Sequence, residues 1–477
     1  MNETLKIRWF YAISITYILF AVYGIYTEKY LVHVLPLLLV FAYLVLFKLE
    51  SVLLILCFIV PFAIEFDDIG MGMGISIPDE PVVMLIMVLS IIRFVVDGNY
   101  DKRVFKHPIS IWIVLNIVWY FITISTSEFP FVSLKFSLSR LWFIVVYYFL
   151  GVMLFRKINN IYTYLWLYAA SLTIVILYTL YSHSLVGFTQ ETSYYISMPF
   201  YRAHGIYSAA IAFFIPFFLV QLFYSYKVKL NIVVVIILFA LVSIFVVGVA
   251  YSYTRAAWLG ILVSLFVSGL VILKISFNKQ LLIALSGLVF FYVFQDQILH
   301  VLAKNKQDSA EGLERHFQSA SNISTDASNT ERINRWMSAI NMWKERPVVG
   351  FGPGTYVFCY APYQEARYRT KISTNFGNQG NSHSEYLNPL SEAGTFGALS
   401  LLVIIYLVLN NALLLFYKTH DYKLKVLLLS VFLAIIGYFV HGLFNHYSET
   451  TKIAPLLWGA FAMITAIDIY HKKDESN

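Results

Sequence analysis

This sequence is poor in cysteine and in charged side chains. Asp, Glu, Lys and Arg make up 13% of its 477 residues, where soluble domains carry roughly 25%. Of its two cysteines, Cys57 falls in an apolar run and Cys359 in a long polar stretch. We therefore expect neither an intramolecular disulfide nor a Cys-x-x-Cys metal or redox motif. The scarcity of charge excludes an ordinary set of soluble domains.

Two further kinds of signal are missing. The first apolar run, near residues 9–26, has no A-x-A-like cleavage site and is followed directly by another run, so we expect no cleavable signal peptide. No cluster of histidines and carboxylates has the spacing of metal ligands. The sequence thus predicts neither a metal nor another cofactor.

Long apolar runs fill most of the chain, which is 59% hydrophobic. Many of these runs are long enough to cross a membrane as a helix. They predict an all-α polytopic membrane protein with about 12–14 transmembrane helices. The runs lie near residues 9–26, 30–47, 50–65, 80–97, 108–126, 134–155, 160–182, 205–224, 230–250, 256–273, 279–298, 394–416, 424–445 and 453–470.

Basic residues gather in alternate short loops, for example at Lys102, Arg103 and Lys106. Because cytoplasmic loops are the basic ones, this asymmetry places both termini in the cytoplasm. The basic residues that give the formal charge of +7 therefore set the orientation of the chain in the membrane. The charge does not indicate nucleic-acid binding. On the external side, Lys29 and Lys452 are expected to snorkel to the interface as flanking residues.

The orientation divides the chain into three parts. Residues 1–300 form transmembrane helices, 301–384 a long external loop, and 385–477 the re-entry and the C-terminal transmembrane helices. Within the loop, residues 304–330 are predicted to form a surface loop or mobile flap.

A helix is predicted near residues 331–346. Its apolar stripe would pack on the membrane domain or lie at the interface, and Pro347 would end it. The stripe comprises Ile333, Trp336, Ile340 and Trp343.

Two external arginines are candidates for anion binding. Arg202 lies where a loop enters a span, and Arg255 lies at a tight turn between two apolar runs. A guanidinium near hydrocarbon is costly and usually faces a partner or a wet cavity. Its planar fork also matches phosphate, so the pair could hold a diphosphate. The alternative is that each arginine anchors its helix at the interface.

His383 ends the polar segment, just before the next span. A histidine can accept a proton from a hydroxyl, although a single loop histidine is more often a plain surface residue. Together with the two arginines it has a coherent use. The cations would stabilise charge on a diphosphate leaving group while the imidazole assists the acceptor hydroxyl.

Arg140 lies near the outer end of another apolar run. It could extend the same basic rim. It could equally pair with a carboxylate such as Glu65, Asp67 or Asp68. The residues leave both interpretations open.

Motifs between about residues 200 and 400 resemble those of the O-antigen ligase and polymerase superfamily. They occur in the order and topology expected of that family. The matching segments are Arg202 with Gly205; Thr254-Arg255-Ala256-Ala257-Trp258-Leu259-Gly260; Arg332-x-x-x-Trp336 with Pro347, Gly350, Gly352 and Gly354; and His383-x-x-Tyr386-Leu387 with Glu392-x-Gly394 and Gly397.

The resemblance implies a multi-pass glycosyltransferase of the bacterial inner membrane whose site faces the periplasm. Such enzymes take a glycan from undecaprenyl diphosphate, use no metal and invert the anomeric centre. By match, Arg202 and Arg255 hold the diphosphate and His383 acts at the acceptor. Possible supporting residues are Arg140, Arg332, Tyr386 and Glu392.

The leading hypothesis is a ligase that attaches the glycan to lipid A-core. A polymerase would use a lipid-linked repeat unit as acceptor, and a third kind of enzyme would use protein hydroxyls. The motifs describe the donor side and do not separate these. A transporter or flippase of lipid-linked sugars is the alternative from another class, but its internal repeats are not evident. Expected partners are the lipid-linked donor, a lipid A-core or glycan acceptor and membrane lipids, with no nucleic acid.

Overall fold

The computed structural model describes residues 3–27, 35–66, 74–98, 101–287, 289, 327–370, 373–375 and 380–471. This described part is helical apart from one short two-stranded sheet, which confirms the all-α membrane fold. By length and composition, eight of its helices could cross a membrane, or up to nine if one pair bent by 118° is a single span. Several of the predicted apolar runs form helices that are shorter than a full span or that bend. Within the described ranges, fewer full-length membrane helices are therefore found than the 12–14 that were expected.

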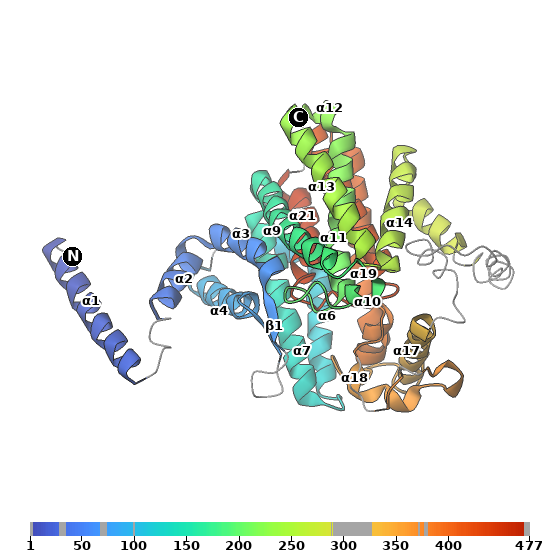
Figure 1. Ribbon diagram of the computed structural model, residues 1–477, viewed down its shortest axis with the longest axis horizontal. Coiled ribbons are helices and arrows are strands. Elements are labelled where there is room, and N and C mark those ends of the chain that lie inside the picture. Colours follow the sequence, from blue (N-terminus) through green and yellow to red (C-terminus); the bar gives the residue numbers. More distant parts are fainter. Residues whose placement is uncertain are drawn as a thin grey trace.

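The first part of the chain contains most of the short elements. They are α1 (Glu3–Tyr26), α2 (Leu35–Phe47), α3 (Leu49–Ile59), η2 (Val60–Phe62), β1 (Ile64–Phe66), β2 (Ile75–Ile77), α4 (Asp79–Asp97), α5 (Lys102–Lys106), α6 (Pro108–Ile124), α7 (Pro130–Phe143), η3 (Ile144–Leu150), α8 (Gly151–Leu154), α9 (Ile158–Ser184) and α10 (Gln190–Ser193). Strands β1 and β2 pair antiparallel, and α1 stands apart from the other helices (Figure 1).

The second part carries the segments that the motifs singled out. It contains α11 (His204–Phe223), α12 (Ser225–Val228), α13 (Ile232–Tyr251), α14 (Arg255–Ile272), α17 (Ala327–Glu345), α18 (Tyr356–Cys359), η4 (Ala361–Tyr363), η5 (Ala366–Tyr368), α19 (Leu387–Lys418), α20 (Tyr422–His441), α21 (Ala454–Ala466) and η6 (Ile467–His471). In Figure 1, α17 and α18 lie at the opposite end of the helical bundle from α12.

Helices α11 and α20 form the centre of the bundle, because both are apolar and mostly buried. Helix α20 packs against α11 and α14. A Cβ atom at Gly260 would lie 2.5 Å from the carbonyl oxygen of Gly437, and the hydroxyl of Ser264 donates to the carbonyl oxygen of Leu433 at 2.9 Å. Small residues allow this close approach. The two contacts define an antiparallel register between α14 and α20.

Helix α17 confirms the predicted helix, beginning earlier than expected, at Ala327. Its apolar stripe packs on the membrane domain. The indole Nε1 of Trp343 donates to the hydroxyl of Thr395 at 3.0 Å, and Trp336 reaches the turn before α19. Of the predicted surface loop, residues 304–326 lie outside the described part of the chain, so that prediction stays open, as do the three predicted divisions of the chain.

Helix α19 is broken near its beginning, where Gly394 has φ 68° and ψ −167°. The backbone N–H groups of Phe351 and Gly352 donate to the carbonyl oxygens of Ser391 and Glu392 at this break, at 3.1 and 2.8 Å. A Cβ atom at Gly394 would lie 2.1 Å from the carbonyl oxygen of Val348. Glycine is therefore required where this glycine-rich turn docks on α19.

The expectation for Lys452 was wrong. Its side chain is buried rather than snorkelling, and Nζ donates to the carbonyl oxygens of Val60 and Ala63 at 2.7 and 2.6 Å. Burial lowers the pKa of Lys452 to about 8, and the charges of Asp79 and Glu65 oppose that shift. The lysine links the α20–α21 loop to η2 and the residue after it, Ala63.

Candidate active site

His383 lies in a turn whose backbone is fixed on both sides. Its φ of 53° is in the left-handed region that residues other than glycine rarely adopt. Its N–H donates to Oδ1 of Asn381 at 3.0 Å, and its carbonyl oxygen accepts from Nε1 of Trp336 at 3.2 Å. The half-buried imidazole is therefore presented from a constrained turn.

The surroundings of His383 keep its ring neutral. Burial, followed by the positive charges of Arg335 and Arg332, lowers the pKa of His383 to about 3, and the side chain of Asn445 opposes this shift. Among the described residues, none forms a hydrogen bond with the buried Nδ1 of His383. A neutral imidazole has one unprotonated nitrogen, which can accept a proton from a hydroxyl group that reaches it.

The two arginines from α17 differ in their surroundings. Arg335 is buried, pairs with Oε1 of Glu331 at 3.0 Å, and donates to the carbonyl oxygen of Asn381 at 3.0 Å. It therefore supports the turn that carries His383. Arg332 is half-buried, and its charge acts on His383. The structure thus brings this predicted supporting residue to the candidate base.

Glu385 forms a buried network that the sequence did not reveal. Its carboxylate accepts hydrogen bonds from Nδ1 of His446 at 2.9 Å and from the backbone N–H groups of Tyr447 and Ser448 at 2.7 and 2.8 Å. The hydroxyl of Ser448 donates at 2.7 Å, and the hydroxyl of Tyr438 also donates. The only sequence signal was a carboxylate two positions after His383 in an otherwise uncharged turn.

The charges within this network reinforce one another. Burial would raise the pKa of Glu385, but the charge of His446 and hydrogen bonds from His446, Tyr438 and Ser448 outweigh burial and lower it to about 2. Burial opposes protonation of His446, yet the charge and hydrogen bond of Glu385 raise its pKa. Each group thus favours the charged form of the other, and the pair joins the His383 turn to residues 442–448.

Arg202 lies beside the same loop. It is exposed and precedes α11, whose second residue is Gly205. A Cβ atom at Gly205 would lie 2.1 Å from the hydroxyl oxygen of Tyr447, so the N-terminus of α11 packs directly on the 442–448 loop. The positive end of a helix dipole favours anions, which suits an arginine placed there.

Arg255 is the first residue of α14 and is half-buried. The α14–α20 register pairs Gly260 with Gly437 and Ser264 with Leu433. One further helical turn toward the N-terminus of α14 reaches Arg255, and one further turn along α20 reaches its last residue, His441. The start of α14 therefore lies opposite the end of α20, where the 442–448 loop begins. The N-termini of α11 and α14 therefore meet at this loop, and each brings one of the predicted diphosphate-binding arginines.

Arg140 is committed to a buried ion pair. It pairs with Glu449, donates to Oδ1 of Asn116 at 2.9 Å, and its guanidinium carbon lies 4.6 Å from the ring centroid of Tyr120. Arg140 could have extended a basic rim or paired with a carboxylate. The structure shows the carboxylate pair, and the partner is Glu449. Arg140 is thus held within the protein and does not lie on an open basic rim.

Two other supporting candidates hold backbone segments together. The buried carboxylate of Glu392 accepts from the N–H groups of Gly354 and Tyr356, each at 2.9 Å. It thus clamps the glycine-rich turn to α19. The hydroxyl of Tyr386 donates to the carbonyl oxygen of Phe439 at 2.9 Å, which fixes the start of α19 to α20.

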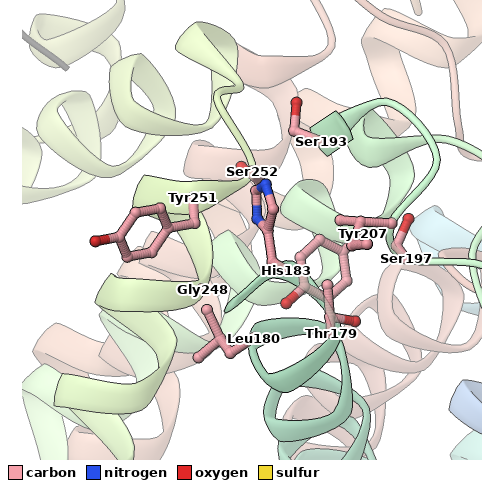
Figure 2. A pocket seen from close by; sticks show the side chains of 10 residues that line it. Thr179, Leu180, His183, Ser193, Ser197, Tyr207, Gly248, Tyr251 and Ser252 are labelled. Atoms are coloured by element: carbon pink, nitrogen blue, oxygen red, sulfur yellow. The ribbon is translucent and has the colours of Figure 1, made fainter. Parts of the chain in front are cut away.

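A small cavity lies between α9, α11 and α13, where Figure 2 shows His183, Thr179 and Tyr207 together. Ser197 and Ser252, which lead toward Arg202 and Arg255, also line it. The space inside it for the centre of a water-sized molecule is about 10 Å³, roughly what a single bound water needs. It cannot accommodate a lipid-linked glycan. Within the described ranges, no group of three or more His, Cys, Asp or Glu could hold a metal ion.

The fold indicates a multi-pass membrane protein, with a polar, cationic candidate site where the α17 segment meets the ends of buried helices. A family model described as O-antigen ligase matches residues 239–402. The match supports the O-antigen ligase and polymerase superfamily, and the matched region contains Arg255, Arg332, His383 and Glu392 and begins after Arg202. A search of curated proteins finds no match. The family supports a glycosyltransferase-like activity of the ligase or polymerase type.

Proposed function

We propose that this protein transfers a glycan from undecaprenyl diphosphate to a hydroxyl group of lipid A-core at the periplasmic face of the bacterial inner membrane. The observation that carries the proposal is the position of His383. Its imidazole lies in a constrained turn, Nδ1 has no hydrogen-bond partner among the described residues, and the positive charge of Arg332 helps to lower its pKa. The helix N-termini that bring Arg202 and Arg255 meet the adjacent loop.

In the proposed reaction, the arginines bind the diphosphate and orient the bond between the anomeric carbon and the phosphate oxygen. The acceptor hydroxyl attacks that carbon from the opposite side while His383 takes its proton, so the anomeric centre inverts. The carrier diphosphate leaves with the bonding electron pair. The guanidinium groups stabilise the negative charge that develops on it. In this scheme they supply the electrostatic stabilisation that a metal ion supplies elsewhere.

Donor binding would also strengthen the base. Burial, Arg335 and Arg332 keep the pKa of His383 at about 3 in the free protein. A bound diphosphate offsets the positive charge of Arg332, so the pKa of His383 rises toward its ordinary value. A base closer to the working pH is a more effective proton acceptor. His383 would then become competent chiefly when the donor is in place.

The decisive experiment uses the purified full-length protein in detergent with undecaprenyl diphosphate-linked glycan and lipid A-core. Glycan joined to lipid A-core is the expected product, with or without a metal chelator. Lengthening of the lipid-linked glycan alone would identify a polymerase, the second candidate. If neither product forms and the lipid-linked substrate instead crosses liposome membranes, the transferase proposal is wrong and the protein is a transporter.

A further inference from the structure

We infer that Lys452 is a positioning residue that fixes the segment carrying Arg202 for binding of the donor diphosphate. This inference rests on the proposed function, because that function assigns Arg202 to the donor. Lys452 lies in the α20–α21 loop, outside the residues that the family model matches.

Lys452 is fully buried, although lysine is one of the side chains least often found inside proteins. Its Nζ donates to the carbonyl oxygens of Val60 and Ala63 at 2.7 and 2.6 Å. These two hydrogen bonds compensate part of the cost of burying the charge, and they use two of the three N–H donors of an ammonium group. The carbonyl oxygen of Lys452 accepts from the hydroxyl of Tyr168 at 2.6 Å, which ties the loop to α9 as well.

The ring of Tyr201 lies against the same ammonium group. Its centroid is 5.2 Å from Nζ of Lys452, within the range in which a cation is attracted to the face of an aromatic ring. Both side chains are fully buried, and such an attraction is stronger when water does not reach it. Because Tyr201 immediately precedes Arg202, this contact holds the chain next to the arginine.

Other contacts leave the backbone of Tyr201 little freedom. Its N–H donates to the carbonyl oxygen of Ser197 at 2.9 Å, and its carbonyl oxygen accepts from the hydroxyl of Ser197 at 2.9 Å. The ring of Phe200 packs on that of Phe62 in η2, with centroids 6.0 Å apart. The segment is therefore joined to η2 twice, once by these two rings and once through the buried ammonium group.

The α20–α21 loop contacts the arginine segment on both sides of Arg202. Lys452 contacts Tyr201, the residue before the arginine. Three residues after the arginine, a Cβ atom at Gly205 would lie 2.1 Å from the hydroxyl oxygen of Tyr447. The exposed Arg202 lies between these two fixed positions. Its side chain can therefore reach a ligand while its backbone stays in place.

The contact with Tyr201 depends on the charge of the lysine. Burial lowers the pKa of Lys452 to about 8, and the charges of Asp79 and Glu65 oppose that shift. As the pH rises through this value, the neutral amine can still donate to carbonyl oxygens but loses the attraction to the ring. The other titratable groups in contact with the lysine are Tyr168 and Tyr201, and tyrosine ordinarily titrates near pH ~10. Only the lysine therefore changes its charge near pH 8.

Substitutions at Tyr201 test the contact while leaving the hydrogen bonds of the lysine intact. Tyr201→Leu removes the aromatic face and should raise the Kd for undecaprenyl diphosphate roughly fivefold or more, whereas Tyr201→Phe keeps that face and should bind as the wild type does. Lys452→Met should resemble Tyr201→Leu. Lys157→Met is the control, because Lys157 is exposed and pairs with Glu50 at 2.8 Å. The measurement is a binding isotherm of the purified full-length protein in detergent.

A measurement that needs no ligand reports on the arginine segment directly. A spin label is attached to Arg202→Cys in a Cys359→Ala background, since Cys57 is fully buried. The mobility of the label in electron paramagnetic resonance should rise when Tyr201→Leu or Lys452→Met is added, and stay unchanged with Tyr201→Phe. It should also rise with pH through the pKa of Lys452, about 8, and lose this pH dependence in Lys452→Met.

The two measurements separate failure of the inference from failure of the proposed function. Unchanged mobility in Tyr201→Leu and Lys452→Met would overturn the inference, whether or not the donor binds. If Arg202→Gln weakens binding of undecaprenyl diphosphate but neither of these variants does, the inference is also wrong and the proposed donor site stands. If Arg202→Gln binds as the wild type does, the proposed role of Arg202 fails, and the mobility at residue 202 still decides whether Lys452 fixes the segment.

Discussion

Nε1 of Trp336 donates a hydrogen bond of 3.2 Å to the carbonyl oxygen of His383, a residue 47 positions further along the chain. The Trp336 ring also lies beside Phe444, with ring centroids 5.9 Å apart. One side chain of α17 thus contacts both the His383 turn and the α20–α21 loop. Helix α17 therefore contributes directly to the geometry of the candidate site.

Replacing Trp336 by phenylalanine should slow transfer. Trp336→Phe keeps most of the apolar packing but removes the N–H group that holds the His383 carbonyl oxygen. A hydrogen bond of this kind contributes about 0.5–1.5 kcal/mol, so we expect kcat to fall roughly two- to tenfold. Trp343→Phe is the matched control, because it loses an indole hydrogen bond to Thr395 instead. Equal effects of both substitutions on kcat would contradict a specific role for Trp336.

His383→Ala should abolish transfer with little effect on folding or on donor affinity. A general base typically contributes about 10²–10⁴-fold to the rate. The measurement is single-turnover transfer with saturating donor, alongside a donor-binding isotherm. Near-normal turnover would remove the base hypothesis.

Arg255→Lys should weaken donor binding even though the charge is kept. Lysine lacks the planar fork that donates two parallel bonds to a diphosphate. The loss of about 1.5–3 kcal/mol per charged hydrogen bond corresponds to a rise in donor KM of roughly 10- to 100-fold. Arg103→Lys is the control, since Arg103 is exposed, pairs with Asp101 and lies in a predicted cytoplasmic loop. If Arg255→Lys retains full activity, Arg255 is only an interface anchor.

The pH profile should respond to the charge at residue 332. Burial, Arg335 and Arg332 lower the pKa of His383 to about 3, so protonation of this base should not limit wild-type kcat/KM near pH 6.5. Removing a positive charge raises the pKa of a nearby histidine. The acidic limb should therefore move to higher pH in Arg332→Gln and stay in place in Arg332→Lys. An identical limb in all three proteins would show that Arg332 does not act on the base.

Gly394→Ala should destabilise the fold. Residue 394 has φ 68°, and its Cβ atom would lie 2.1 Å from the carbonyl oxygen of Val348. We expect a loss of about 3 kcal/mol or more. Gly269→Ala is the control, because a Cβ atom there has no neighbour within 4 Å, and alanine favours a helix by about 1 kcal/mol. Thermal unfolding in detergent should show a lower Tm only for Gly394→Ala.

Local patterns predicted part of this architecture well. The period of Trp336 and Trp343 was sufficient to identify α17 and its packed face, because helical spacing is a short-range property. Hydropathy also identified the membrane fold. It could not show that the run before residue 50 bends by 118° into the next helix, or that α6 is only 17 residues long. Such breaks depend on packing that an apolar run does not encode.

The candidate site was harder to predict, because its contacts join residues far apart in sequence. Glu385 binds His446 across 61 positions, and Arg140 binds Glu449 across 309. The sequence supplied His383 and the arginines as isolated motifs. It did not indicate that the α20–α21 loop lies beside these motifs, because Asn445 and Tyr447 of that loop belong to no recognisable sequence pattern. The burial of Lys452 was missed for the same reason. Its partners Val60 and Ala63 accept through backbone carbonyl oxygens, which every residue has, so their residue types do not indicate the contact.

The close contact of Gly260 with Gly437 has a consequence for how such proteins can diversify. It sets the spacing between Arg255 and the end of α20 through the backbone of two small residues. A larger side chain at either glycine would push α14 away from α20 and, in the proposed mechanism, would shift the guanidinium of Arg255. Related proteins that keep this contact could therefore vary elsewhere while preserving the proposed donor site.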